Sequence, residues 1–238
     1  MQIIDVDHDA DSSRDTWEKL FQIIYMRKFG QCLDLINIQD TETSTPKRWY
    51  AKINKNEYPE MRREYPKFKM AGDCDFNFNS KKVELYRELL NGEESSLLTE
   101  CANMHHNLYN FSFMPITGNM QDVKGSDKYD RFDKFVYLLS IYYNQTSIED
   151  REKSQILSHA TKVNKPVLMK YLDSFNSVFE YCREIYFIDE SFVKELIANS
   201  NNGIGIHDEK AAIQYMNLAK EYWGIRKSYF KENFNIEF

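Results

Sequence analysis

The stretch from His105 to Phe135 gathers the side chains of this chain that could do chemistry. It holds two adjacent histidines, several asparagines, paired acids and several cations, interleaved with aromatic residues. Polar groups on a loop between rigid elements are typical of a binding site. Such groups also satisfy the backbone of half-buried loops, because Asn and Asp side chains form turns and caps. Both interpretations stay open, and the ligand-binding candidates are Asn110, Asn119, Gln121, Lys124, Asp130, Arg131 and Asp133.

Turn-forming residues predict how these candidates come together. Pro115 fixes one bend, while Gly118 and Gly125 permit backbone angles that other residues resist. We therefore expect the loop to fold back over a helix that starts near Asp130. This arrangement would place the candidates, except Gln121, around one concave site.

Within that site we expect the acids to meet the cation of the loop. Asp130 and Asp133 would contact Lys124, and Arg131 would reach an anionic ligand or close the network. The alternative is that the two acids only complement the helix dipole and cap free N–H groups. If the site is functional, Ala in place of Asn119 or Lys124 should abolish activity and leave the melting temperature nearly unchanged.

His106, Asn110 and Asn119 could together hydrolyse a phosphodiester. A His could activate water, an Asn could orient it, and a second His or Asn could hold a divalent metal against the phosphate. Their order resembles the HNH-type nuclease signature H-x-x-G-N-L with a later Asn, although Tyr109 stands where that signature has Gly. This resemblance implies a metal-dependent nuclease in which these three residues are catalytic. Adjacent histidines alone predict no metal site, because neighbours on a helix point about 100° apart.

The same stretch also resembles a bacterial domain family of unknown function. The family pattern is N-F-x-x-x-P, then an Asn, a basic residue followed by Gly, and D-x-x-D at the start of a helix. The resemblance covers roughly a quarter of the chain and implies no activity. The matching residues are Asn110, Phe111, Pro115, Asn119, Lys124, Gly125, Asp130 and Asp133.

Charge is distributed unevenly along the chain. Residues 1–18 carry a net charge of −5, and residues 46–69 carry +5 with aromatic residues interleaved. Rings that stack on bases and cations that follow phosphates form single-strand nucleic-acid platforms. A solvated face whose aromatic residues are partly core is the alternative. The nucleic-acid candidates are Lys47, Arg48, Trp49, Arg62 and Arg63.

Composition predicts a mainly α protein. The chain has 238 residues, of which 42% are hydrophobic and 15% aromatic, with only 8 Gly and 5 Pro. We expect one domain over residues 1–238, with an irregular half (1–129) and a helical, bundle-like half (130–238). Short strands could lie around residues 40–79, at Trp49–Ile53 and Asp75–Phe78.

The clearest helical spacing lies in the second half of the chain. Apolar residues recur there at i, i+3 and i+4, which predicts helix after helix from Asp130 onward. The cleanest apolar face combines Leu168, Leu172, Phe175 and Phe179, which we expect to be buried together on one helix.

Localisation follows from two absences in the sequence. We find no signal peptide and no apolar run of the roughly 18–20 residues that a membrane span requires. Four scattered cysteines without C-x-x-C spacing suit a reducing compartment, so we expect a cytoplasmic protein without a membrane partner.

The sequence therefore favours a cytoplasmic protein of an uncharacterised bacterial or phage family that acts through the loop at 105–133, with phage defence or a mobile element as its context. The alternative is an HNH-like nuclease or another nucleic-acid-binding protein. A divalent metal is expected only for the nuclease, and no other cofactor is expected. The partner would be a nucleic acid or a protein, and whether the protein is an enzyme stays open.

Overall fold

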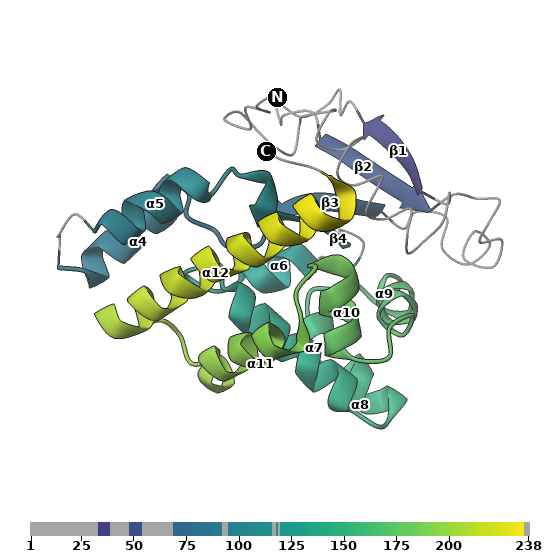
Figure 1. Cartoon of the computed structure of the whole chain (residues 1–238). Helices are drawn as coiled ribbons and strands as arrows, with labels where there is room; N and C mark the ends of the chain where they lie inside the picture. The colour runs from purple at the N-terminus through teal and green to yellow at the C-terminus, as the bar shows by residue number, and fades with distance from the viewer. Residues whose placement is uncertain are drawn as a thin grey trace.

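Helices dominate the part of the chain that the computed structural model describes, as predicted (Figure 1). The structure describes residues 33–38, 48–53, 69–91, 95–115, 118 and 120–235. The nucleic-acid candidates Lys47, Arg62 and Arg63 lie outside these ranges, as does the site candidate Asn119. Within the same ranges, no helix is both long and apolar enough to cross a membrane.

A four-stranded antiparallel sheet forms the first part of the fold. The predicted strand at Trp49–Ile53 is confirmed as part of β2. The sheet extends further than predicted, because β4 follows β3 only after two helices. All five residues of β4 are buried, and the apolar–polar alternation covers only its first three residues, which is too short to mark a strand. The strands are β1 (Leu33–Ile38), β2 (Arg48–Ile53), β3 (Lys69–Cys74) and β4 (Phe111–Pro115), in that order across the sheet.

The predicted strand at Asp75–Phe78 is wrong. Strand β3 ends at Cys74, and the following backbone N–H groups find partners outside the sheet. The N–H of Phe76 donates to Oδ1 of Asn110 at 2.9 Å, and the N–H of Phe78 donates to Nδ1 of His105 at 3.3 Å. Side chains from the next segment thus replace the ladder that a strand would need.

Most of the described helices start at an N-cap residue whose side chain accepts a backbone N–H of the first turn. Asp189 and Asp208, for example, accept the N–H of Phe192 and Ala211. Such caps satisfy N–H groups that have no partner inside the helix. The helices are α4 (Ser80–Leu89), α5 (Ser96–Met104), α6 (Met120–Gly125), α7 (Phe132–Asn144), α8 (Ile148–Glu152), α9 (Lys165–Leu172), α10 (Val178–Ile185), α11 (Glu190–Asn199) and α12 (Glu209–Phe234), with short 3-10 turns at Leu108–Asn110, Gln155–Leu157 and Asn201–Gly203.

The apolar face predicted on one helix is divided between two. Leu168, Leu172 and Phe175 are buried as expected, whereas Phe179 is only partly buried. The chain leaves the helical path after α9 because Ser177 starts α10 by accepting the N–H of Glu180. The two short helices therefore pack as separate pieces.

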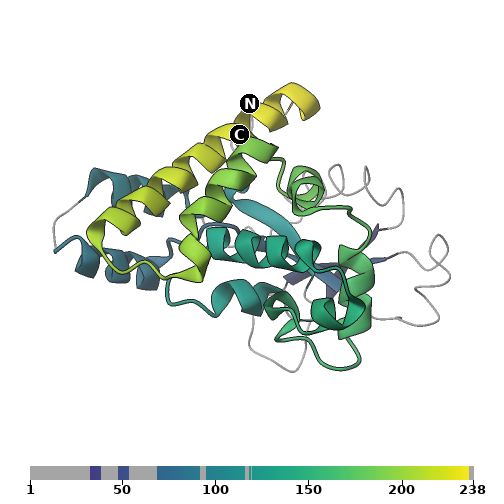
Figure 2. The same cartoon turned by 90° about the horizontal axis from the view of Figure 1, so that it is seen from below.

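Helix α12 lies along the rest of the molecule and supplies much of its core. Figure 1 and Figure 2 show it running past α4 and α5 on one side and α10 and α11 on the other. The ring of Phe76 lies 5.1 Å from that of Tyr215 and 5.2 Å from that of Tyr222, measured between centroids. Phe132 of α7 lies 5.2 Å from Phe76 and from Tyr222. Rings from the segment after β3, from α7 and from α12 thus meet in one part of the core.

Candidate functional site

Asn110 lies inside the protein and binds backbone. Its amide Nδ2 donates to the carbonyl oxygens of Phe76 at 2.7 Å and His105 at 2.8 Å, and its Oδ1 accepts the N–H of Phe76. The residue has no exposed surface. An Asn held in this way bridges two loops, whereas an Asn that orients a water for phosphate hydrolysis must face solvent.

The two histidines have different environments. His105 is buried, and its ring lies 4.4 Å from that of His106, which is exposed. Burial, together with the neighbouring His106, lowers the pKa of His105 to about 4. Both histidines line a pocket of about 350 Å³, together with Glu84 and Arg87. Within the described ranges, no three His, Cys, Asp or Glu residues lie close enough to hold a metal ion.

Lys124 meets Asp130 as the sequence predicted, with 2.8 Å between Nζ and Oδ1. Its Nζ also lies 3.2 Å from Oδ2 of Asp73 and donates to the carbonyl oxygen of Cys74 at 2.5 Å. The Lys124 side chain is fully buried. Burial acts to lower the pKa of Lys124, but the charges of Asp73 and Asp130 outweigh it and hold that pKa well above its usual range. The ammonium is therefore committed to this cluster.

Asp133 does not meet Lys124 but pairs with Arg131. Nε of Arg131 donates to Oδ1 of Asp133 at 2.9 Å, and Nη2 donates to Oδ2. Burial acts to lower the pKa of Arg131, but the hydrogen bonds and the charge of Asp133 outweigh this effect and raise the pKa above its usual value. The four charged candidates thus belong to two buried ion-pair clusters, and the guanidinium of Arg131 has a carboxylate partner before any ligand arrives.

Gln121 takes no part in these clusters. Gln121 is partly buried in the first turn of α6, and its Nε2 donates to the carbonyl oxygen of Gly72 at 3.5 Å. Arg48 and Trp49 belong to β2, and the structure describes only their backbone.

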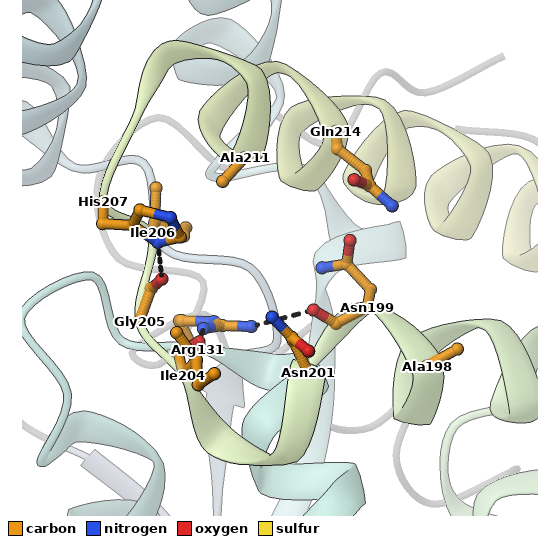
Figure 3. A pocket seen from close by; sticks show the side chains of 10 residues that line it. All are labelled: Arg131, Ala198, Asn199, Asn201, Ile204, Gly205, Ile206, His207, Ala211 and Gln214. Carbon is orange, nitrogen blue, oxygen red and sulfur yellow. Dashed lines mark hydrogen bonds between the residues drawn. The ribbon is translucent and has the colours of Figure 1, made fainter.

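Arg131 reaches from the predicted loop into a pocket between α11 and α12 (Figure 3). Its Nη1 donates to the carbonyl oxygen of Ile204, and its Nη2 donates to that of Asn199 at 3.4 Å. The pocket has a volume of about 200 Å³. Its lining is Arg131, Ala198, Asn199, Asn201, Ile204, Gly205, Ile206, His207, Ala211 and Gln214.

A strained turn shapes one wall of this pocket. Asn201, Asn202 and Gly203 all have positive φ, at 47°, 57° and 83°. Three consecutive left-handed residues are costly, and Gly relieves the cost at only one of them. Asn199 anchors the start of the turn, because its Nδ2 donates to Oδ2 of Asp133 at 2.7 Å. The Arg131–Asp133 pair thus holds the turn against the start of α7.

A third buried cluster, around Asp75, was not predicted from the sequence. Its Oδ2 accepts hydrogen bonds from Ser112 of β4 and from Tyr222 and Arg226 of α12. Nη2 of Arg226 donates to the carbonyl oxygen of Phe111 at 2.6 Å. This cluster joins the sheet to α12. Only the residue types, a lone Asp after a strand and an Arg on an apolar helix face, could have suggested it.

Comparison with known proteins adds no relatives: no protein-family model, no curated protein and no solved structure matches this chain.

Proposed function

We propose that this protein is a binding protein that holds a small, uncharged polar group in the pocket beside Arg131. The observation that supports this proposal is the position of Arg131. It is a member of the polar loop singled out from the sequence, it is buried, and it lines a pocket in which amide side chains gather.

Charge balance favours an uncharged ligand. The guanidinium of Arg131 is matched by the buried carboxylate of Asp133. An anion in the pocket would have to compete with that carboxylate, and a cation would meet the guanidinium. Desolvating a further charge without a partner is costly.

Hydrogen-bonding capacity favours a ligand that both donates and accepts. Asn201 and Gln214 line the pocket, and their side chains make no hydrogen bond with any other described residue. Each primary amide offers two donors and one acceptor oxygen. A volume of about 200 Å³ holds roughly six or seven water-sized groups. A carboxamide with a short backbone fits both the size and the chemistry.

The binding experiment uses N-acetylglycinamide as the probe, followed by ¹⁵N NMR of the full chain. Acetate and guanidinium serve as charged probes of comparable size. We expect the side-chain amide signals of Asn199, Asn201 and Gln214 to shift saturably with N-acetylglycinamide and little with the charged probes. No saturable shift, or a stronger response to acetate, would contradict the proposal.

A variant pair localises the binding. Gln214→Ala should weaken it about five-fold, because one neutral hydrogen bond contributes about 1 kcal/mol. Asn217→Ala removes another exposed amide from the same helix, outside the pocket lining, and should bind like the parent. Equal weakening in both variants would show that the response does not come from this pocket.

A further inference from the structure

A larger groove lies along α12, away from the Arg131 pocket. It has a volume of about 700 Å³ and lies between α12 and the turn that joins α10 to α11. Its floor is apolar and is formed by Phe187, Ile188, Ile225 and Tyr229. This volume is within the range of pockets that bury whole ligands or several side chains.

The floor is held in place at a cost to the backbone. Phe187 has a φ of 58°, which is a rare conformation for a bulky residue. In this conformation its ring stacks on that of Tyr229, with 5.1 Å between centroids, and packs edge-on against Phe230 at 5.5 Å. A strained aromatic residue that is fixed by its neighbours gives the groove a rigid base.

The rim of the groove is acidic. Asp189, Glu221 and Glu232 line it, and within the described chain none of them has an ion-pair partner. Arg183, a cation on the same rim, pairs with Glu184. Burial raises the pKa of Glu221, and the nearby acids Glu195 and Asp189 raise it further. Among the residues that the structure describes, the negative charge around the apolar floor thus has no ion-pair partner.

Gly224 leaves α12 without a side chain at the edge of this groove. It lies in the interior of the helix, where Gly costs about 1 kcal/mol relative to Ala. A Cβ at this position would meet nothing within 4 Å. No described part of the chain therefore requires the glycine. Gly224 also lines a smaller pocket of about 210 Å³ with Trp223 and Lys227, so no side chain separates the two hollows at this position.

From these features we infer that the groove binds a basic amphipathic helix of a partner protein. Apolar side chains of that helix would rest on Phe187, Ile225 and Tyr229. Its Lys or Arg side chains would meet Glu221 and Glu232. The missing side chain at position 224 would let the partner backbone approach closely. Helix-in-groove recognition combines these same components, an apolar face in a groove and complementary charge around it.

The test uses the full chain and a fluorescent peptide of Leu and Lys at i, i+3, i+4 spacing. An otherwise identical peptide with Glu for Lys tests the charge, and a scrambled peptide tests the spacing. We expect saturable binding of the Lys peptide, at least ten-fold weaker binding of the other two, and a loss of affinity with added salt. Absence of saturable binding, or equal binding of all three peptides, would overturn the inference.

Two leucine variants locate the site. Gly224→Leu should weaken binding at least ten-fold without lowering the melting temperature, since Leu favours a helix and has open space. Asn217→Leu places the same side chain on the same helix, outside the lining of the groove, and should bind like the parent. Unchanged binding by Gly224→Leu overturns the site.

Charge variants and self-association complete the test. Glu221→Gln with Glu232→Gln should weaken the Lys peptide several-fold and flatten the dependence on salt. Sedimentation of the unliganded protein asks whether a second copy fills the groove instead. A concentration-dependent dimer that Gly224→Leu abolishes would overturn the assignment to a separate partner.

Discussion

Lys124 shows most directly how the polar loop is used. The sequence led to the expectation that removing this side chain would leave the melting temperature nearly unchanged. The structure argues for the reverse, because the buried ammonium forms ion pairs with Asp73 and Asp130 and also donates to the Cys74 carbonyl oxygen. Breaking a buried ion pair from one side leaves uncompensated charge.

We therefore predict that Lys124→Met lowers the free energy of unfolding by about 3–5 kcal/mol, measured by urea denaturation. Lys128→Met changes an exposed lysine four residues later and should stay within about 0.5 kcal/mol of the parent. A Lys124 variant as stable as its control would restore the loop interpretation in which this cation is free for a ligand.

His105 and Asp75 give the protein two opposed responses to acid. The pKa of His105 is lowered from 6.5 to about 4, chiefly by burial, so the unfolded chain takes up this proton first as pH falls. Its contribution to stability is complete above pH 6.5 and is lost towards pH 4. Burial raises the pKa of Asp75 from 3.8 to about 6, so its contribution is complete below pH 3.8 and is lost as pH rises to 6.

We predict that single substitutions at His105 and Asp75 separate the two opposed dependences of stability on pH. As the pH falls from 7 to 4, the free energy of unfolding of the parent should decrease by on the order of 2–3 kcal/mol relative to that of His105→Gln. Relative to Asp75→Asn, it should gain a similar amount over the same range. Urea denaturation at several pH values measures both differences. Parallel profiles for parent and variant would show that the residue in question does not titrate differently in the folded state.

Among the elements, the α9–α10 corner offers the sharpest test of packing. Phe175 is 2% exposed and lies between the two helices, with its ring 4.9 Å from that of Tyr181. We predict that Phe175→Ala costs about 3–5 kcal/mol, because a buried ring leaves a cavity. Phe179→Ala, on the partly buried side of α10, should cost clearly less. Thermal melts of the two variants compare them directly, and equal losses would contradict the division of the predicted face.

Local spacing explains which elements could be predicted. Leu168 and Leu172 recur at helical intervals, and Asp189 and Asp208 stand where N-caps belong, so these helices were visible in the sequence. Strand β4 was not, since a fully buried strand has no alternation to reveal it. The segment after β3 was predicted as a strand, but its N–H groups donate to the side chains of Asn110 and His105. Those side chains lie about thirty residues further along the chain, so local spacing could not reveal these bonds.

At the scale of the whole molecule, Arg226 holds the sheet and the longest described helix together. Its guanidinium pairs with Asp75, and its charge lies 5.1 Å from the ring centroids of both Tyr222 and Phe230. The two partners are 151 residues apart in sequence, so no spacing rule could have joined them. The same holds for the Arg131 pocket, whose walls come from segments that only the fold brings together.

We predict that Arg226→Met alone costs about 3–5 kcal/mol, since it strands the Asp75 carboxylate among apolar side chains. Asp75→Asn in the same chain should recover part of this loss, because no buried charge then remains. A double-mutant cycle by urea denaturation gives the coupling between the two residues. Additive losses would show that the pair does not act as a unit.

The position of α12 in the chain also bears on how the protein is made. Among the described elements α12 is synthesised last, yet Tyr215, Tyr222 and Arg226 from this helix complete a core begun by Phe76 and Asp75. While a ribosome is still translating the preceding helices, Phe76 and Asp75 lack the partners that α12 supplies. Transiently exposed apolar surface of this kind is what chaperones protect. The described core can therefore be completed only after α12 has emerged, and we expect the nascent chain to be most prone to aggregate in the interval just before.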